Sequence, residues 1–445
     1  MTSFFDIDTK VINCGCDSNF SGALTCYFCF VKEIQHTLQL DSAAFDYDLP
    51  EAAIALHPLE PRSRARLLHV SKSEITSAGT FEDLPGLLPK GFQLWVNDTR
   101  VIRARLILSK ATGGRLELFL LEPVGMSMEQ ALCSTKPLIW RCLVRGAKRW
   151  RDGKASLLGE GELAQWNVQA QLHEIEEGTR QVRFEWGDEG NKTTWGELLE
   201  MLGNTPLPPY MRRKDEAQDA QDYQTVYAEV PGSVAAPTAG LHYDEPLLAK
   251  LREAGTVHSV TLHVGAGTFK PLTTGVVVDH VMHGEHCVVS FESLANLAKE
   301  GVHRVVTGTT TLRTLESLYW LALKWKMNGK QPEGLDQWEW ANELQSIDEA
   351  LNWDMAKAMS WAMDQLQGQD WVFHTSIMMV PTYRIRSCQA LVTNFHLPKS
   401  TLLCLVAAAI GERWREVYQD ALNQGFRFLS YGDGSYLEIE NKKAR

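Results

Sequence analysis

The sequence predicts an α/β protein with a mainly parallel sheet, flanked by helices, and a small inserted antiparallel β-barrel domain. Beyond about residue 195, short apolar runs alternate with helical segments, as in a parallel sheet covered on both faces. Residues 92–186 hold only short β-rich runs between glycines, as in a small barrel or sandwich. We therefore expect a poorly ordered N-terminal extension at 1–41, a discontinuous catalytic domain at 42–97 and 195–445, and the barrel at 98–194.

The β-rich block contains five runs of strand-forming residues. They are Phe92 to Val96, Val101 to Leu108, Arg115 to Leu121, Trp140 to Val144 and Val182 to Trp186. An earlier strand is expected at Leu67 to Val70.

The α/β part has clear helix signals. Asp244 can cap a helix that continues through Leu251 and stops at Gly255. Further helices are expected around Leu312 and over Thr401 to Ile410. The strands that should alternate with these helices are Val257 to Val264, Val305 to Val306, Ala390 to Thr393 and Phe426 to Ser430.

Residues 320–371 interrupt this alternation and hold seven of the 14 tryptophans. A stripe from Leu344 to Met363 has helical spacing, which favours a packing helix. A lid helix or a partner-binding helix is the alternative.

Composition favours a soluble cytoplasmic enzyme. The 445 residues carry a net charge of −11, and no run approaches the ~20 apolar residues of a membrane helix. Nine cysteines are too few for a disulfide scaffold of this length, so Cys133, Cys142, Cys287, Cys388 and Cys404 are expected to be reduced thiols. Cys14, Cys16, Cys26 and Cys29 could bind zinc, although a metal-free extension is favoured. No secretory signal is recognisable.

Polar, glycine-containing segments follow four of the predicted strands. These segments are His263–Phe269, Gly308–Arg313, Thr393–Pro398 and Tyr431–Gly434. Ligands of open parallel sheets bind beyond the carboxyl ends of the strands. Four such endings on one edge predict an active site there.

The residue types suggest roles within that site. Thr309 to Thr311 open a helix and could hold an anion, and Arg313 could pair with a carboxylate. Asp433 could hold ribose hydroxyls. His242, His263 and His396 are candidate acids or bases.

Other motifs point less clearly to chemistry. Gly265 and Gly267 do not form a dinucleotide-binding fingerprint, because the third glycine of that motif is missing. The spacing of His280, His283 and His286 is compatible with a metal site, but we favour the interpretation that these residues bind no metal. The strip from Pro206 to Lys214 is either a linker or a nucleic-acid contact through Tyr210, Arg212 and Arg213. Further basic groups are Arg62/Arg64/Arg66, Arg100/Arg103/Arg105 and Lys148/Arg149/Arg151, which mildly favour a polyanionic partner.

Together these segments resemble the S-adenosylmethionine:tRNA ribosyltransferase-isomerase family of queuosine biosynthesis, over roughly residues 43–319 and 373–437. The most specific matches are Asn97–Ile102, Gly203–Tyr210, Tyr223–Tyr227, Val234–His242 and Thr261–Phe269. Asp279-His280, Met282-His283, Gly308–Arg313 with Glu316, Thr393–Pro398 and Tyr431–Asp433 complete the set.

The resemblance implies an α/β domain with an inserted barrel. It implies transfer and isomerisation of the ribosyl part of S-adenosylmethionine, the co-substrate, onto 7-aminomethyl-7-deazaguanine at the tRNA wobble position. The product is epoxyqueuosine, with adenine and methionine released. No bound cofactor, no metal, no membrane association and a monomer are expected.

We expect His263 or His242 to act as the base, Asp433 to bind the ribose, and Arg313 or Arg100 to bind a carboxylate or phosphate. The other expected substrate-binding residues are Asp98, Tyr210, Arg212, Pro237, Thr238, Gly240, Gly265, Gly267, Thr268, Thr309, Thr310, Glu316, Asn394, His396 and Tyr431.

Some segments depart from the family pattern. They are Arg103, Val380–Arg386, Gly434–Tyr436, the extension and the 320–371 insert. These departures leave two alternatives: a paralogue that splits S-adenosylmethionine but modifies another acceptor, or a non-catalytic RNA-binding protein.

Overall fold

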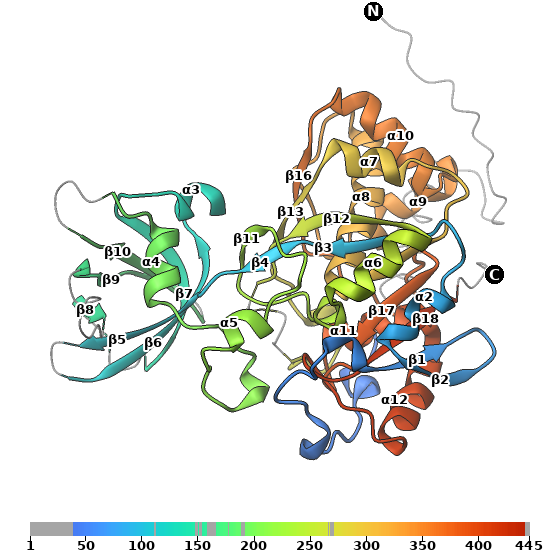
Figure 1. Ribbon diagram of the computed structural model, residues 1–445. Coiled ribbons are helices and arrows are strands. Elements are labelled where there is room, and N and C mark those ends of the chain that lie inside the picture. Colours follow the sequence, from blue (N-terminus) through green and yellow to red (C-terminus); the bar gives the residue numbers. More distant parts are fainter. Residues whose placement is uncertain are drawn as a thin grey trace, which may run out of the picture.

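The computed structural model of the chain describes residues 39–110, 113–146, 150, 154–157, 166–176, 178–187, 192–265, 267 and 271–440. A ten-stranded sheet in the order β15-β16-β13-β12-β3-β14-β17-β18-β1-β2 forms its centre (Figure 1). Its strands are β1 (Arg66–Val70), β2 (Ile75–Thr80), β3 (Gln93–Asn97), β12 (Thr256–Leu262), β13 (Glu285–Val289), β14 (Arg304–Thr307), β15 (Gly334–Leu335), β16 (Trp371–Thr375), β17 (Ala390–Asn394) and β18 (Gly434–Glu438).

The predicted α/β fold is confirmed, and the sheet is mixed rather than mainly parallel. Strands β12, β3, β14 and β17 run parallel at the centre. Antiparallel pairs flank this centre, because β13 folds directly back onto β12 and β18 runs back beside β17. The carboxyl ends of the four central strands therefore meet at one edge.

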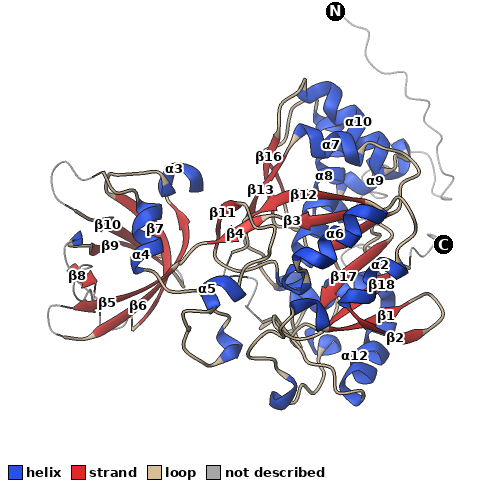
Figure 2. Ribbon diagram, viewed as in Figure 1, coloured by secondary structure: helices blue, strands red, loops and turns tan. Residues whose placement is uncertain are grey.

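Helices cover both faces of the sheet (Figure 2). Alternate residues of β3 point to opposite sides: Trp95 joins the core beneath α8, whereas Leu94 and Val96 join the core beneath α6. The helices outside the barrel are α2 (Leu84–Leu87), α5 (Asp219–Asp222), α6 (Glu245–Ala254), α7 (Phe291–Leu297), α8 (Thr309–Asn328), α9 (Glu343–Leu351), α10 (Met355–Leu366), α11 (Thr401–Ile410) and α12 (Trp414–Asn423).

Six further strands close into an antiparallel barrel in the order β10-β7-β6-β5-β8-β9. Figure 1 shows this barrel beside the main sheet, joined to it through β4 (Thr99–Val101), which pairs with β11 (Val230–Ser233). The barrel has its own apolar core, and α4 packs into that core through Trp195, Leu198 and Leu199. The elements are β5 (Arg105–Lys110), β6 (Arg115–Pro123), β7 (Leu138–Arg145), β8 (Lys154–Leu157), β9 (Gln169–Ile175), β10 (Arg180–Glu185), α3 (Met128–Leu132) and α4 (Trp195–Leu202).

Two expectations about local structure need correction. Phe426 to Ser430 is not a strand, since only Phe428 forms an isolated bridge, to Ile54. The last strand is instead β18, just downstream, which pairs with β17 in register Asn394 to Gly434. The expected helical stripe from Leu344 to Met363 is divided between α9 and α10, because Asn352 ends α9 in the left-handed conformation, with φ of 46°.

The tryptophan-rich insert packs onto the body of the protein. Trp320, Trp325, Trp340 and Trp371 are buried in the main core. Leu344, Met355 and Met359 of the helical stripe are buried in the same core, so the stripe packs onto the body of the protein, as favoured from the sequence.

Within the described part of the chain, no helix is long and apolar enough to cross a membrane. The five cysteines of that part, Cys133, Cys142, Cys287, Cys388 and Cys404, are free thiols. Cys14 to Cys29 and Lys148/Arg149/Arg151 lie outside the described residues.

Candidate functional site

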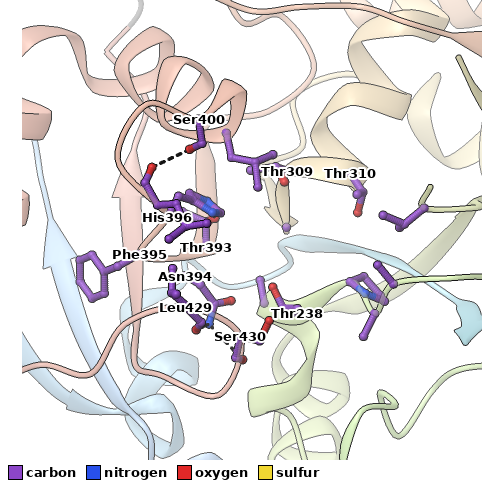
Figure 3. A pocket seen from close by; sticks show the side chains of 18 of the residues that line it. Thr238, Thr309, Thr310, Thr393, Asn394, Phe395, His396, Ser400, Leu429 and Ser430 are labelled. Atoms are coloured by element: carbon purple, nitrogen blue, oxygen red, sulfur yellow. Dashed lines mark hydrogen bonds between the residues drawn. The ribbon is translucent and has the colours of Figure 1, made fainter. Parts of the chain in front are cut away.

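A first cavity lies at the carboxyl edge of the central strands (Figure 3). Segments that are far apart in the sequence meet there: the loop around Pro237, the start of α8, and the loop after β17. Its lining residues are Tyr210, Ala235, Ala236, Pro237, Thr238, Ala239, Val264, Gly308, Thr309, Thr310, Thr393, Asn394, Phe395, His396, Leu397, Ser400, Leu402, Leu429 and Ser430. Three of the four polar endings predicted from the sequence thus contribute to one hollow.

The start of α8 gives the first cavity its hydrogen-bond donors. Gly308 caps this helix with φ of 86°, a conformation that favours glycine, and Thr309 and Thr310 follow it into the cavity wall. The first N–H groups of an α-helix have no partner within the helix and attract negative charge. The α8 end can therefore bind oxygen atoms of a ligand.

Asn394 supplies an acceptor to the same cavity. Its Nδ2 donates to Leu429 O at 3.0 Å and lies 2.9 Å from His242 Nε2. Its Oδ1 is buried and has no hydrogen-bond partner within the described part of the chain. A buried acceptor without a partner is costly, so this oxygen can accept a hydrogen bond from a donor on a ligand.

A second cavity lies between the barrel and the main sheet. Barrel residues such as Met128 and Arg141 form one wall, and His263, His283, His286 and His374 contribute to the other. Val264 lines both this cavity and the first one. The end of β12 therefore separates two adjoining hollows, with His263 on the side of the second.

His263 is held by one ring nitrogen. Its Nδ1 is hydrogen-bonded to Thr99 Oγ1 at 3.0 Å, and its ring stacks on His286 with centroids 5.9 Å apart. Burial, with a smaller contribution from His286, lowers the pKa of His263 to about 4. At neutral pH the imidazole is uncharged, and it can accept a proton through Nε2.

Asn97 is a positioning residue that is absent from our predicted site residues, although it opens one of the matched motifs. Its Nδ2 donates to Leu262 O and to Thr310 Oγ1, and its Oδ1 accepts from the N–H of Thr99 and of Leu262. One buried amide thus connects the α8 start, the end of β12 and the threonine that holds His263. The positioning role of Asn97 follows from its burial and its hydrogen bonds, and neither can be read from the sequence alone.

His242 lines neither cavity, and its role as a catalytic base stays a prediction. It is 4% exposed and stacks on Phe81 at 4.3 Å. Burial, followed by the positive charges of Arg427 and Arg62, lowers the pKa of His242 to about 3. A neutral Nε2 accepts from Asn394, so His242 orients that amide rather than contacting a ligand.

Two carboxylates that we expected to bind substrate are bound internally instead. Asp433 accepts from the backbone N–H of Arg66 at 2.9 Å and of Arg427 at 2.8 Å. Glu316 accepts from Tyr383 and from the 386–387 segment. Because nearby donors occupy both carboxylates, these residues stabilise loops in this structure, and their predicted contact with substrate stays a prediction.

Asp98 and Tyr431 are also structural. The Asp98 carboxylate accepts from Thr261 Oγ1 at 2.7 Å, and Tyr431 packs edge-on against Tyr223. Neither residue lines the first or second cavity. Their predicted contact with substrate is therefore not supported.

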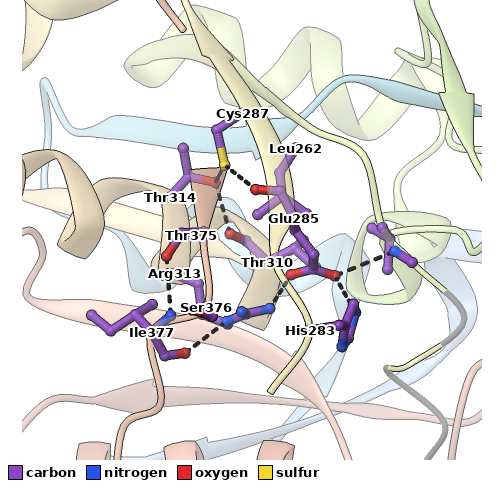
Figure 4. Close-up of polar contacts among 12 residues, drawn as sticks. Leu262, His283, Glu285, Cys287, Thr310, Arg313, Thr314, Thr375, Ser376 and Ile377 are labelled. Atoms are coloured by element: carbon purple, nitrogen blue, oxygen red, sulfur yellow. Dashed lines mark hydrogen bonds and ion pairs between the residues drawn. The ribbon is translucent and has the colours of Figure 1, made fainter. Parts of the chain in front are cut away.

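Arg313 is buried in an ion pair with Glu285 (Figure 4). Its Nη1 donates to Glu285 and its Nε donates to Ile377 O at 3.2 Å. Burial raises the pKa of Glu285, but the Arg313 guanidinium, His283 and the backbone N–H of Gly265 together outweigh this effect and lower it to about 2. Arg313 does not reach the first cavity, although Thr309 and Thr310 of the same helix line it.

The basic residues divide into exposed and internal ones. Arg213 forms a two-point ion pair with Asp219, at 2.6 and 2.7 Å, and is therefore internal. Arg212 is exposed and pairs with Glu51 at 2.8 Å. Arg100 is exposed on β4, and no ion pair to it is found among the described residues. Arg100 and Arg212, like the exposed Arg64, can therefore meet a polyanion.

The predicted glycines allow close packing around the site. A Cβ on Gly240 would lie 2.0 Å from the Tyr227 hydroxyl, and one on Gly267 would lie 2.2 Å from the His283 ring. Gly265 lines the second cavity. Thr268 lies outside the described residues.

Among the residues that the structure describes, no group of three or more His, Cys, Asp or Glu side chains is arranged to hold a metal ion. His283 precedes β13, whereas His286 is the second residue of that strand. This finding concerns the histidine cluster and leaves the Cys14 to Cys29 segment untested.

Acid should destabilise the fold through its buried neutral histidines. Burial lowers the pKa of His242 and of His396 to about 3, against roughly 6.5 in an unfolded chain. Between these values the unfolded chain binds more protons, so stability falls as pH falls below about 6.5, by up to about 1.4 kcal/mol per pH unit for each such group. Melting curves from pH 7 to 5 should show the decline, and His396→Gln should reduce its slope. A melting temperature independent of pH would contradict this.

Comparison with known proteins finds relatives whose names refer to the same kind of enzyme. Residues 42–437 match the family model described as queuosine biosynthesis protein. S-adenosylmethionine:tRNA ribosyltransferase-isomerase of Synechococcus sp. (strain RCC307) is 37% identical over 89% of this chain and 96% of its own. The enzyme of the same name from Gloeobacter violaceus is 39% identical, over 88% and 95%. A crystal structure of S-adenosylmethionine tRNA ribosyltransferase from Thermotoga maritima, 26% identical, covers 88% of this chain and 99% of its own, with a TM-score of 0.40.

Proposed function

The chain belongs to the queuosine biosynthesis protein family, and from this premise we propose that it is an S-adenosylmethionine:tRNA ribosyltransferase-isomerase. It transfers and isomerises the ribosyl group of S-adenosylmethionine onto 7-aminomethyl-7-deazaguanine at the tRNA wobble position. The products are epoxyqueuosine in tRNA, adenine and methionine.

The pair of adjoining cavities is the observation that carries this proposal. A transfer between two large substrates needs two binding spaces that meet at the reacting atoms. Val264 lines both cavities, and His263 stands beside it. A protein that only bound RNA would not need an enclosed cavity next to its RNA surface.

The adenosine part of S-adenosylmethionine is assigned to the first cavity. Adenine carries an exocyclic amine, which is the kind of donor that the buried Asn394 Oδ1 requires. Thr238, Thr309, Thr310 and Thr393 lie around the same space and offer hydroxyl groups to the ribose. In place of Asp433, these threonines are our candidates for holding the sugar.

The acceptor base is assigned to the second cavity. This cavity opens between the barrel and the main sheet, where a flipped-out nucleotide can enter. The sulfonium acidifies the hydrogens on the adjacent C5′ carbon, and uncharged His263 can take one of them. Thr99 would keep the histidine ring in position through Nδ1 during that step.

The departures from the family pattern do not touch either cavity. Arg103, Val380–Arg386, Gly434–Tyr436 and the 320–371 insert contribute none of the residues that line the two cavities. Tyr383 and Arg386 instead contact Glu316, and Gly434–Glu438 is β18. This distribution favours the usual acceptor over a paralogue with a new one.

The barrel forms a structural domain inserted into the catalytic domain in this proposal. Its separate core supports that division, and the position of α4 moves the end of the insert from residue 194 to Leu202. Residues 203–440 and 42–97 then form the catalytic domain.

A direct assay tests the proposed function. Purified protein is mixed with S-adenosylmethionine and with tRNA that carries the aminomethyl-deazaguanine base. Free adenine and a modified nucleoside in the tRNA are expected. Adenine release without tRNA modification would favour another acceptor, and neither product would exclude the enzymatic proposal.

The tRNA contact should depend on Arg100 and on salt. Each lost phosphate contact lowers the slope of log affinity against log salt by about one unit or slightly less. Arg100→Ala should show this change while S-adenosylmethionine affinity stays constant. Arg252→Ala is the matched control, since Arg252 is exposed on α6 near the opposite edge of the sheet. Equal slopes for both variants would remove Arg100 from the tRNA surface.

A further inference from the structure

A third, smaller cavity lies between the two described above. It shares Leu402 with the first cavity, and Gly267 and His283 with the second. Apolar side chains form most of its wall: Met282, Ile377, Met378, Met379, Leu402 and Leu405. Arg313 is the one cationic side chain among its lining residues in the described part of the chain.

Arg313 presents an unused hydrogen-bond donor at this place. The residue is only 5% exposed, and its Nε and Nη1 donate hydrogen bonds to Ile377 O and to Glu285. Its Nη2 has no hydrogen-bond partner among the residues that the structure describes. A guanidinium nitrogen buried without an acceptor is costly, so an acceptor is expected in the occupied state.

We propose that the third cavity is the subsite for the methionyl end of S-adenosylmethionine, with Arg313 Nη2 donating to its carboxylate. This inference rests on the proposed function and extends it to the orientation of the substrate. The apolar wall suits the methylene groups of the methionine chain. Methionine side chains in that wall are unbranched and can adjust to a ligand that enters and leaves.

The charges explain why an amino acid, rather than a simple anion, fits this subsite. Glu285 already neutralises Arg313, and burial of this pair leaves no net positive charge to hold a bare anion. An amino-acid head group is a zwitterion, and its α-ammonium group compensates the carboxylate. The ion pair can therefore meet a neutral head group without creating an unbalanced buried charge.

The arrangement also sets the direction of the substrate. With adenine at Asn394 in the first cavity and the carboxylate at Arg313 in the third, the sulfonium and C5′ lie between them. The second cavity shares His283 and Gly267 with the third and Val264 with the first. The reacting carbon is then next to the acceptor space and to His263.

Arg313→Lys tests the subsite without removing the positive charge beside Glu285. Binding of S-adenosylmethionine and of decarboxylated S-adenosylmethionine is measured by calorimetry on wild type and on the variant. We expect Arg313→Lys to weaken S-adenosylmethionine about 10- to 100-fold and to leave the decarboxylated ligand within a few-fold. Arg304→Lys is the matched control, because Arg304 is also buried but bonds to Leu297 O and Lys299 O.

Equal weakening of both ligands by Arg313→Lys, or no weakening of either, would overturn the subsite. If the variant does not fold, wild type alone decides: it should bind S-adenosylmethionine at least about tenfold more tightly than the decarboxylated ligand, and equal affinities would overturn the proposal. A wild type that binds neither ligand would instead overturn the proposed function itself.

Discussion

Replacement of His263 by alanine is expected to slow adenine release at least about a hundredfold, with S-adenosylmethionine affinity within a few-fold of wild type. Loss of a general acid or base typically costs 10²–10⁴-fold in rate. His263 lines the second cavity beside Val264, and its low pKa keeps it uncharged and able to accept a proton. Single-turnover adenine release, a binding titration and a melting curve are the required measurements.

Two further variants separate proton transfer by His263 from a bracing role. His263→Asn can keep a hydrogen bond to Thr99 but cannot act as the base, so it should be as slow as alanine. His258→Asn changes a histidine near the start of β12, outside the cavities, and should have a much smaller effect on the rate. Near-normal turnover in His263→Ala would remove this residue from the mechanism. A joint loss of stability and binding would mean that it only braces the loop.

Glu316→Ala is expected to destabilise the fold strongly, by about 1–3 kcal/mol for each buried donor that is left without a partner. The fully buried Glu316 carboxylate accepts from Tyr383 Oη at 2.6 Å, from Arg386 N at 2.8 Å, and from Ser387 N and Oγ at 2.7 and 2.6 Å. Alanine would leave all four donors buried without a partner. Urea unfolding measures the loss.

Binding distinguishes this structural role from the contact with substrate that the sequence suggested. Folded Glu316→Ala should bind S-adenosylmethionine within a few-fold of wild type, because Glu316 lines none of the three cavities. Glu316→Gln keeps one acceptor oxygen and should lose less stability. A stable variant with weak binding would contradict our account and restore Glu316 to the site.

Part of the order of strands, loops and helices could be predicted from the sequence, because it depends on local patterns. Gly308 followed by three threonines marks the start of α8, and the loop after β17 follows an apolar run. These signals correctly predicted that several polar loops share one edge of the sheet. The last strand was misplaced because Phe426 and Phe428, which are buried in the core, have the same apolar pattern as a strand.

The use of each polar side chain could not be predicted from the sequence. Asp433 and Glu316 look like ligand-binding carboxylates until the fold brings backbone N–H groups to them. Arg313 stands in the expected segment, but β13, which we did not predict, brings Glu285 to it. Such pairings join residues far apart in the chain, and only the tertiary structure shows them.

The fate of the ribose tests the central claim most directly. S-adenosylmethionine is labelled in one preparation on the ribose carbons and in another on the methionine carbons, and each is incubated with protein and tRNA that carries the aminomethyl-deazaguanine base. Our account predicts ribose label in the tRNA, in amounts equal to the adenine released, and no methionine label there. Methionine label in the tRNA, or ribose label that stays in small molecules, would contradict it.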